Sequence, residues 1–336
     1  MKWLKIIILS LLVIIFCCFC AEQKNIVILA SYDADDLCGK PQLEGVVDSL
    51  KSNLKDINIA TLYLDSRRLS QENFNEKCEE FRKTVENKKA SLIITIDDAA
   101  FNCAAKHYMG KSIPVIFSGI NVTPESYNQK FNFLDDRRPI KNFTGVYEKL
   151  FFSKQIELLE VLIGRVDKIA VLYSTDFMGE TLKNQVIHEL KDSKSERKLL
   201  FFPISSLEDL VKASDEINRR KEITAYFPFV MSIKNGNIRT LKDVSPIITQ
   251  KIKKPDLVVN REFMELGFLG GVSVDFYKMG YRAGELASYV LKGVKISSLE
   301  VEEAREYVKI INLRRAKELK LEIPVKKLTI FNEILL

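Results

Sequence analysis

The sequence predicts an α/β protein made of two similar lobes, each built on a parallel β-sheet that is covered by helices. Short apolar runs rich in Ile and Val alternate with amphipathic helical patterns along most of the chain, as in sheets that are buried on both faces. This alternation is interrupted at 121–147, where Pro124, Pro139 and a DDRR run occur. With 336 residues, the chain also has the length of two ordinary domains.

The apolar runs are expected to form strands because each is short, continuous and rich in β-branched residues. In chain order they are 25–31, 57–64, 91–96, 113–119, 167–174, 197–204, 223–230 and 255–260. The segment 143–148 leads from the interruption into the second series. We read 267–276 as a further strand that returns to the first lobe, because it comes just before another helical stripe.

Between the strands, apolar residues recur at helical spacing and predict amphipathic helices. The stripes are Leu43, Val46, Val47, Leu50 and Leu54; Leu207, Leu210, Val211 and Ile217; and Met279, Ala283, Leu286 and Val290. Ser206 is placed to cap the second helix and Gly293 to end the third. We therefore expect an N-terminal lobe of 22–147 plus 266–310 and a C-terminal lobe of 148–265 plus 311–336.

Residues 1–20 have the layout of an export signal. Two lysines precede an apolar core from Ile6 to Phe16, which is too short for a comfortable membrane span. Two cysteines at its end are candidates for lipid attachment, as in a bacterial lipoprotein. Such signals place an aliphatic residue three positions before the acylated cysteine and a small residue directly before it.

Cys18 fits this lipoprotein pattern best, with Ile15 and Cys17 at the two positions, and Cys20 is the alternative. Ordinary cleavage near Ala21, or retention as an uncleaved anchor, is the other interpretation of the same segment.

Three further cysteines follow the signal, and an odd number cannot pair fully within one chain. Cys78 shares an apolar helical stripe with Phe74, Phe81 and Val85, so we expect it to be a small core residue. Cys38 and Cys103 lie near strand-end loops, where a disulfide between them is the alternative.

Composition and motifs argue against several functions. The net charge is +6, but lysine and arginine alternate with acidic residues and no basic arm occurs, so nucleic-acid binding is not expected. The two histidines, His107 and His188, have no second ligand at metal-binding spacing. No catalytic motif occurs, and we expect neither an enzyme nor a bound cofactor or metal.

Small polar residues follow many of the expected strands. They are Ser31, Tyr32, Asp33, Asp97, Asp98, Ser118, Gly119, Asn121, Ser174, Thr175, Asp176, Asn260, Glu262 and Asp275. Each has a plainer interpretation as a cap or turn residue, and one of the two adjacent aspartates is expected to cap the helix that begins at Ala99. Ligands of open parallel sheets bind beyond the carboxyl ends of the strands. Together these residues therefore predict a solute-binding cleft between the lobes.

Three stretches resemble a known family in their order along the chain. They are IITIDDAAFNCAAKHYMGKSIPVIFSGIN, GVYEKLFFSKQIELLEVLIGRVDKIAVLYS, and GGVSVDFYKMGYRAGELASYVLKG followed by IINLRRAKELKLEIP. The sequence is similar to the bacterial ABC-transporter substrate-binding family that includes tryptophan- and tyrosine-type binding proteins. The likeness covers nearly all of the chain beyond the signal.

This resemblance implies a type I periplasmic binding fold, with two Rossmann-like lobes joined by a hinge. It implies a monomeric, extracytoplasmic lipoprotein of the periplasm or cell exterior that closes on a small solute, such as an amino acid, and delivers it to a membrane permease. Asp275 is the residue we most expect to contact a ligand, through a ligand amino group. Aromatic contacts would come from Tyr32, Tyr173, Phe227 or Phe229.

Parts of the sequence depart from the family pattern and keep other functions open. The segment FPFVMS places Phe229 and Val230 where the family usually has a small polar residue and an acid, and FSGIN resembles a branch used as the sensing module of membrane receptors. A sensing module that signals through a separate receptor is therefore the alternative, and an exported enzyme is a third. Because the sequence given ends at Leu336 without a further domain, we expect a free-standing binding protein.

The lipid anchor gives a direct prediction. Processing of the expressed protein should be blocked by globomycin, and the protein should incorporate labelled palmitate, because acylation of Cys18 or Cys20 precedes cleavage in lipoproteins. Release of an unacylated soluble protein would contradict the anchor.

Overall fold

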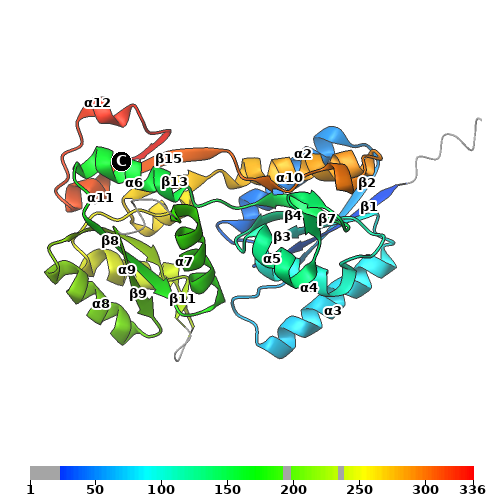
Figure 1. Cartoon of the computed structure of the whole chain (residues 1–336), viewed down its shortest axis with the longest axis horizontal. Coiled ribbons are helices and arrows are strands. Elements are labelled where there is room, and N and C mark those ends of the chain that lie inside the picture. The colour runs from blue at the N-terminus through cyan, green and yellow to red at the C-terminus, as the bar shows by residue number, and fades with distance from the viewer. Residues whose placement is uncertain (1–22, 192–197, 234–237) are drawn as a thin grey trace, which may run out of the picture.

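The computed structural model describes residues 23–191, 198–233 and 238–336, which form two α/β lobes lying side by side (Figure 1). The first lobe has a six-stranded sheet of order β14-β7-β4-β3-β1-β2, with parallel pairing throughout. Its strands are β1 (Lys24–Ala30), β2 (Ile57–Tyr63), β3 (Leu92–Ile96), β4 (Val115–Ile120), β7 (Phe143–Tyr147) and β14 (Glu302–Glu303). Its helices are α2 (Gly39–Asn53), α3 (Gln71–Asn87), α4 (Asp97–Tyr108), α5 (Pro124–Phe131) and α10 (Phe276–Leu291). A small antiparallel pair, β5 (Leu134–Asp135) and β6 (Arg138–Pro139), follows α5.

The second lobe contains two three-stranded sheets. The first has the order β10-β8-β9 and is formed by β8 (Lys168–Ser174), β9 (Leu199–Ile204) and β10 (Ile223–Phe229). The second has the order β13-β15-β16 and is formed by β13 (Gly270–Val274), β15 (Tyr307–Asn312) and β16 (Glu333–Leu335). Around them lie α6 (Phe152–Ile163), α7 (Phe177–Leu190), α8 (Leu207–Arg219), α9 (Leu241–Lys251), α11 (Leu313–Glu318) and α12 (Val325–Leu328). Short elements of this lobe are β11 (Ser232–Ile233), β12 (Arg239–Thr240) and η2 (Arg261–Leu266), whereas η3 (Ile296–Ser298) contacts β6 of the first lobe.

One apolar run was wrongly expected to be a strand. Residues 255–260 form only an isolated bridge, between Asp256 and Tyr226. The Asp256 carboxylate is fully buried and accepts hydrogen bonds from Arg315 Nε (3.0 Å) and the Leu269 backbone N–H (2.5 Å). This segment is buried because it surrounds a buried ion pair, and burial alone gives it the apolar composition of a strand.

The strand expected at 267–276 does not return to the first lobe. Its observed form, β13, pairs antiparallel with β15. Gln155 of α6 fixes it further, accepting from the Val272 N–H (2.8 Å) and donating to the Val272 carbonyl (2.5 Å). The helix after this strand, α10, makes the return and packs against α2 (Figure 1).

The chain therefore passes between the lobes three times: after β7, after β13, and between β14 and β15. A hydrogen bond from the Asp275 N–H to the Glu306 carbonyl (3.1 Å) joins the second and third passages. A hydrogen bond from the Ala304 N–H to the Tyr147 carbonyl (2.9 Å) joins the third passage to the first. The lobe boundaries given by residue number above stay a prediction.

The cysteine pairing differs from both expectations. Cys78 of α3 forms a disulfide with Cys103 of α4, with the two Cα atoms 5.7 Å apart. Cys38 is free and buried at the start of α2. The two bonded cysteines meet because α3 and α4 pack together within one apolar core, an arrangement that their spacing in the sequence does not reveal. Cys17, Cys18 and Cys20 lie outside the described residues.

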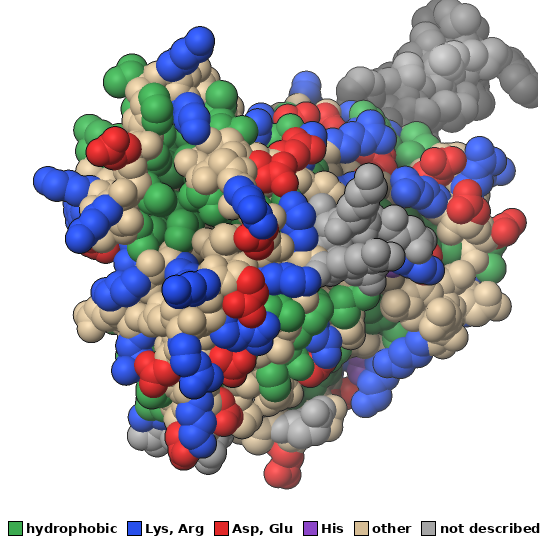
Figure 2. Space-filling model, turned by 60° about the vertical axis from the view of Figure 1, so that its left-hand side comes forward, with side chains coloured by type: hydrophobic (Ala, Val, Ile, Leu, Met, Phe, Trp, Pro, Cys, Tyr) green, Lys and Arg blue, Asp and Glu red, His purple; other side chains and the backbone are tan. Residues whose placement is uncertain are grey.

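The surface shown in Figure 2 has lysine and arginine side chains interspersed with acidic ones. Within the described ranges, no helix combines the length and the apolar character that a membrane span requires.

The first lobe depends on a close contact between α2 and α10. A Cβ atom on Gly45 would lie 2.1 Å from the Tyr277 carbonyl oxygen, and one on Gly280 would lie 2.1 Å from the Gln42 carbonyl oxygen. Only glycine therefore allows the two backbones to approach this closely.

We predict that Gly45→Ala lowers the free energy of unfolding by about 1–3 kcal/mol in urea titrations, because the added methyl group overlaps the α10 backbone. Helix propensity alone would make the alanine variant about 1 kcal/mol more stable. The sign of the change in unfolding free energy therefore tells whether the close contact or helix propensity dominates. The control is Glu44→Ala, at an exposed position of the same helix. Stabilisation by Gly45→Ala would contradict the close packing.

Candidate functional site

A cleft between the lobes contains two adjoining hollows. The outer hollow has a volume of about 510 Å³ and is lined by Tyr32, Ser66, Arg67, Leu69, Ser70, Phe74, Asp98, Ala99, Asn102, Asp176, Phe177, Met178, Met231 and Ser232. The inner hollow, with a volume of about 30 Å³, is lined by Tyr32, Cys38, Arg67, Asp97, Asn121, Glu148, Met178, Leu182, Met231, Val259, Asn260, Phe263 and Phe276. Both lobes contribute to each hollow.

Strand ends bring these side chains to the cleft. In the first lobe, Asp97 follows β3 directly and Glu148 follows β7 directly, while Arg67 lies just beyond β2. In the second lobe, α7 begins at Phe177 after its cap, Asp176. Parallel strands place their carboxyl ends along one edge, so residues far apart in the sequence meet there.

Asp98 has mainly a structural role. Its buried carboxylate accepts hydrogen bonds from the backbone N–H groups of Asn121 (2.8 Å) and Val122 (3.1 Å) and from the Tyr127 hydroxyl (2.8 Å). Burial raises its pKa, and these donors act in the opposite direction. Asp98 thereby fixes the segment after β4 against α4.

Asp97 and Glu148 are buried acids of a different kind, with side chains in the inner hollow. Burial, followed by the nearby charge of Glu148, raises the pKa of Asp97 well above its usual range. Burial, followed by the charge of Asp98, raises the pKa of Glu148 to about 8. Like charges and desolvation both disfavour ionisation, so the protonated form of Glu148 is favoured at neutral pH, and the pKa of Asp97 is shifted in the same direction.

Arg67 provides a fixed positive charge beside the acids. Its guanidinium group lies 3.7 Å from the centre of the Tyr32 ring and forms an ion pair with Asp36. Asp36 also accepts from the backbone N–H groups of Cys38 (3.1 Å) and Gly39 (2.8 Å) at the start of α2. Arg67 is thus held in place by stacking and by a buried carboxylate.

Six of the predicted ligand contacts come together in this cleft: Tyr32, Asp97, Asp98, Asn121, Asp176 and Asn260. The other eight, Ser31, Asp33, Ser118, Gly119, Ser174, Thr175, Glu262 and Asp275, are not among the residues that line it. The plainer interpretation accounts for several. Ser31 Oγ accepts from the Ala100 N–H (2.9 Å) near the start of α4, and Ser118 Oγ donates to Gln42 Oε1 (3.0 Å).

Asp275, the residue most expected to contact a ligand, lies elsewhere. It caps α10 by accepting from the Lys278 N–H (2.9 Å). It lines a separate hollow of about 190 Å³, together with Lys278, Arg282 and the segment 302–306. The cause is the strand before it, because β13 belongs to the sheet of the second lobe and ends at the crossing between lobes.

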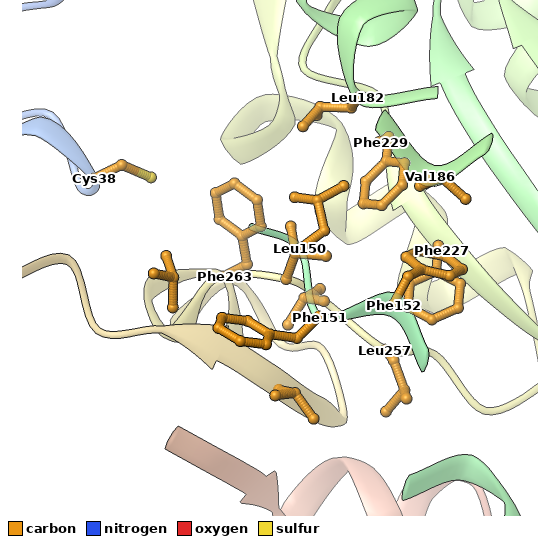
Figure 3. Close-up of a cluster of buried hydrophobic side chains, with 14 of the residues drawn as sticks. Cys38, Leu150, Phe151, Phe152, Leu182, Val186, Phe227, Phe229, Leu257 and Phe263 are labelled. Carbon is orange, nitrogen blue, oxygen red and sulfur yellow. The ribbon is translucent and has the colours of Figure 1, made fainter. Parts of the chain in front are cut away.

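Of the expected aromatic residues, Tyr32 lines both hollows, whereas Tyr173, Phe227 and Phe229 line neither. Phe227 and Phe229 are buried in the core of the second lobe, where the Phe227 ring centre lies 4.4 Å from that of Phe152 (Figure 3). The aromatic residues that line the outer hollow are Tyr32, Phe74 and Phe177. Phe177 is 60% exposed at the start of α7, so an apolar ring faces the cleft without being packed.

Sequence reasoning missed Arg67, Glu148 and Phe177. The strand-end rule could have found the first two, since Arg67 comes just after the run expected at 57–64 and Glu148 is the last residue of the run expected at 143–148. Phe177 has no such signal, because an aromatic residue at the start of a helix is more often part of the core.

Comparison with known proteins agrees with this geometry. The model of the family described as ABC transporter substrate binding protein matches residues 35–331. The chain belongs to this family. Members of the family bind solutes and are not enzymes.

Individual relatives are more distant. A tyrosine-binding protein of Clostridioides difficile is 25% identical over 236 residues, or 68% of this chain and 63% of the relative. The matched part of the chain thus spans less than two thirds of that relative.

Two solved structures share the fold. One is a domain of Streptococcus pneumonia in complex with L-Trp (TM-score 0.71, 20% identity, 94% of this chain and 100% of that one). The other is the ligand-free, open form of a substrate-binding protein with adhesive properties from Clostridium difficile (TM-score 0.70, 18% identity, 93% and 99%). These matches confirm the predicted two-lobed α/β fold of type I periplasmic binding proteins.

The raised pKa of Glu148 predicts how stability depends on pH. Its folded value of about 8 exceeds the ordinary value of 4.5, so the folded protein binds more protons than the unfolded chain between these limits. The stabilising contribution is complete below about pH 4.5 and is lost as pH rises through about 8. Asp97, Asp98 and Glu262 act in the same direction.

The ligand-free protein should therefore melt at progressively lower temperature from pH 5 to pH 8, and Glu148→Gln should reduce this slope. Scanning calorimetry across that range measures both, with the exposed Glu44→Gln as the control. Equal slopes for Glu148→Gln and wild type would show that Glu148 has an ordinary pKa.

Proposed function

We propose that the protein is the extracytoplasmic solute receptor of an ABC transporter, closing its two lobes on an amino acid or a similar small solute and delivering it to a membrane permease. The observation that carries this proposal is the cleft, in which buried polar groups from both lobes and the largely exposed ring of Phe177 line two adjoining hollows. Three chain crossings beside the cleft provide a hinge of the kind that such closure requires.

The chemistry of the cleft supports an amino acid with an apolar or aromatic side chain. Asp97 and Glu148 are suited to an ammonium group, and Arg67 to a carboxylate. Tyr32, Phe74, Phe177, Met178 and Met231 offer apolar surface for a side chain. The outer hollow, about 510 Å³, lies within the range of roughly 300–1,000 Å³ that is usual for small-molecule pockets.

The relatives point the same way. One is named a tyrosine-binding protein, and one solved structure contains L-Trp. We propose an aromatic amino acid as the ligand of this chain as well, because its own cleft contains aromatic rings and buried acids.

We also propose that the protein is attached to the membrane through a lipid on Cys18 or Cys20 and acts as a monomer. A lipid anchor would keep the receptor near its permease. The same cleft could also serve a sensing module that signals through a separate membrane receptor, because ligand binding and closure are common to both functions.

The proposal predicts that one class of small solute raises the melting temperature of the mature protein, because a ligand that binds only the folded state stabilises it. We would screen L-amino acids, nucleosides and sugars by thermal shift, and we expect the largest increase, of several degrees at saturation, with an aromatic amino acid.

The matched variant is Phe177→Ala, which should weaken binding of that solute about tenfold while leaving the melting temperature of the ligand-free protein unchanged, since the ring is largely exposed. Val325→Ala, at an exposed apolar position of α12 outside the cleft, is the control. A protein that no small solute stabilises would contradict the receptor function.

A further inference from the structure

Two buried oxygen atoms in the inner hollow have no partner. Asp97 Oδ2 and Asn260 Oδ1 are both buried without a hydrogen bond to any part of the chain that the structure describes. The residues are 3% and 6% exposed, respectively, and both line the inner hollow. Buried polar atoms are usually paired because desolvation without a partner costs free energy. Asn260 Oδ1 is an acceptor, and both oxygens of the Asp97 carboxylate accept once the group is ionised, so a positively charged donor is the partner that satisfies both atoms.

The two acceptors come from opposite lobes. Asp97 begins α4 in the first lobe, whereas Asn260 precedes η2 in the second. The Asn260 amide is held across the cleft, where its Nδ2 donates to Cys38 Sγ (3.0 Å) at the start of α2. With the amide nitrogen used in this way, the oxygen is the group left to bind a ligand.

The charges around the inner hollow favour a cation. Glu148, 4% exposed, lines it beside Asp97. Arg67 also lines it, but its guanidinium group is already paired with Asp36. The other titratable groups that line it, Tyr32 and Cys38, are buried, and burial raises the pKa of each, so both stay neutral. Glu262 lies close enough to raise the pKa of Glu148 further. The hollow thus has an excess of acid over base.

The size and position of the inner hollow suit the head group of a larger ligand. Its volume of about 30 Å³, compared with about 510 Å³ for the outer hollow, leaves space only for a small group. It shares Tyr32, Arg67, Met178 and Met231 with the outer hollow. A ligand with its body in the outer hollow therefore reaches the inner one with a single small group.

We propose that the inner hollow binds the primary ammonium group of the ligand, with Asp97 and Asn260 accepting its hydrogen bonds from opposite lobes. A primary ammonium group has three donors and can satisfy both acceptors with one left for Glu148. Because the acceptors belong to different lobes, the ammonium group itself links them and favours closure. This inference rests on the proposed function, and it specifies which part of the solute closes the protein.

The first experiment compares matched ligands by thermal shift and calorimetry on the mature protein. The probes are L-phenylalanine, L-tyrosine and L-tryptophan, the corresponding amines (phenethylamine, tyramine and tryptamine), and the corresponding acids without the amino group. We expect the best amino acid to bind at least a hundredfold more tightly than its deaminated acid, and its amine to keep measurable binding. Small-angle X-ray scattering should show compaction with the amino acid and none with the deaminated acid.

Other results would overturn the inference in distinguishable ways. Equal affinity for the amino acid and its deaminated acid would refute the ammonium site and leave the receptor function intact. The ammonium site would also be refuted if only sugars or nucleosides stabilised the protein. The same holds if sodium, potassium or calcium chloride raised the melting temperature without any organic solute. If none of these solutes bound, both the inference and the receptor function would fail.

The second experiment separates ligand binding from folding. Asp97→Asn should reduce affinity for the best amino acid at least tenfold while leaving the melting temperature of the ligand-free protein unchanged or higher, because it removes a buried acid that has no partner. Asparagine also tolerates the left-handed backbone at this position, where φ is 66°. Asn260→Leu should likewise weaken binding and prevent compaction.

The control for these variants is Asp215→Asn, on the exposed surface of α8, which should behave as wild type. Full affinity in Asp97→Asn would overturn the assignment. A melting temperature lowered in Asp97→Asn without loss of affinity would show that the carboxylate has only a structural role.

Discussion

The cleft depends on the burial of two carboxyl groups, Asp97 and Glu148, with too little positive charge beside them. Arg67 is the nearby cation, and its ion pair with Asp36 already balances it. Burying acids in this way disfavours the empty state. A ligand that supplies a positive charge recovers the free energy that the burial of the two acids costs. We would not expect a fold selected only for stability to keep these buried acids.

The rest of the structure holds these acids in place. Parallel strands bring their ends to one edge, Asp98 fixes the segment after β4, and Gly45 and Gly280 allow α2 and α10 to pack closely behind the sheet. The second lobe has its own aromatic core, seen in Figure 3, and presents α7 and Asn260 to the opposite side of the cleft. Each lobe thus supports one side of the cleft, and the three crossings are where movement between the lobes can occur.

Much of the fold could be predicted from the sequence because buried parallel strands are read from apolar runs. The failures have physical causes. The segment 255–260 is apolar because it surrounds the buried Asp256. The strand β13 is held in the second lobe by its hydrogen bonds to Gln155, a contact that no local sequence pattern reveals. For the site, the strand-end rule selected Asp97 and Asn260, which line the inner hollow. It also selected Asp275, because it cannot tell which sheet a strand joins, and it could not foresee that Phe177 stays exposed.

The most direct test is whether ligand binding releases a proton. Titration calorimetry with the best-binding amino acid at pH 7, repeated in buffers of different ionisation enthalpy, measures the protons exchanged. We predict net release from wild type, because an ammonium group lowers the raised pKa of Glu148, which is about 8, and drives its ionisation, with less release from Glu148→Gln. Tight binding without proton exchange would contradict the claim that the buried Glu148, protonated before the ligand binds, forms part of the ligand site.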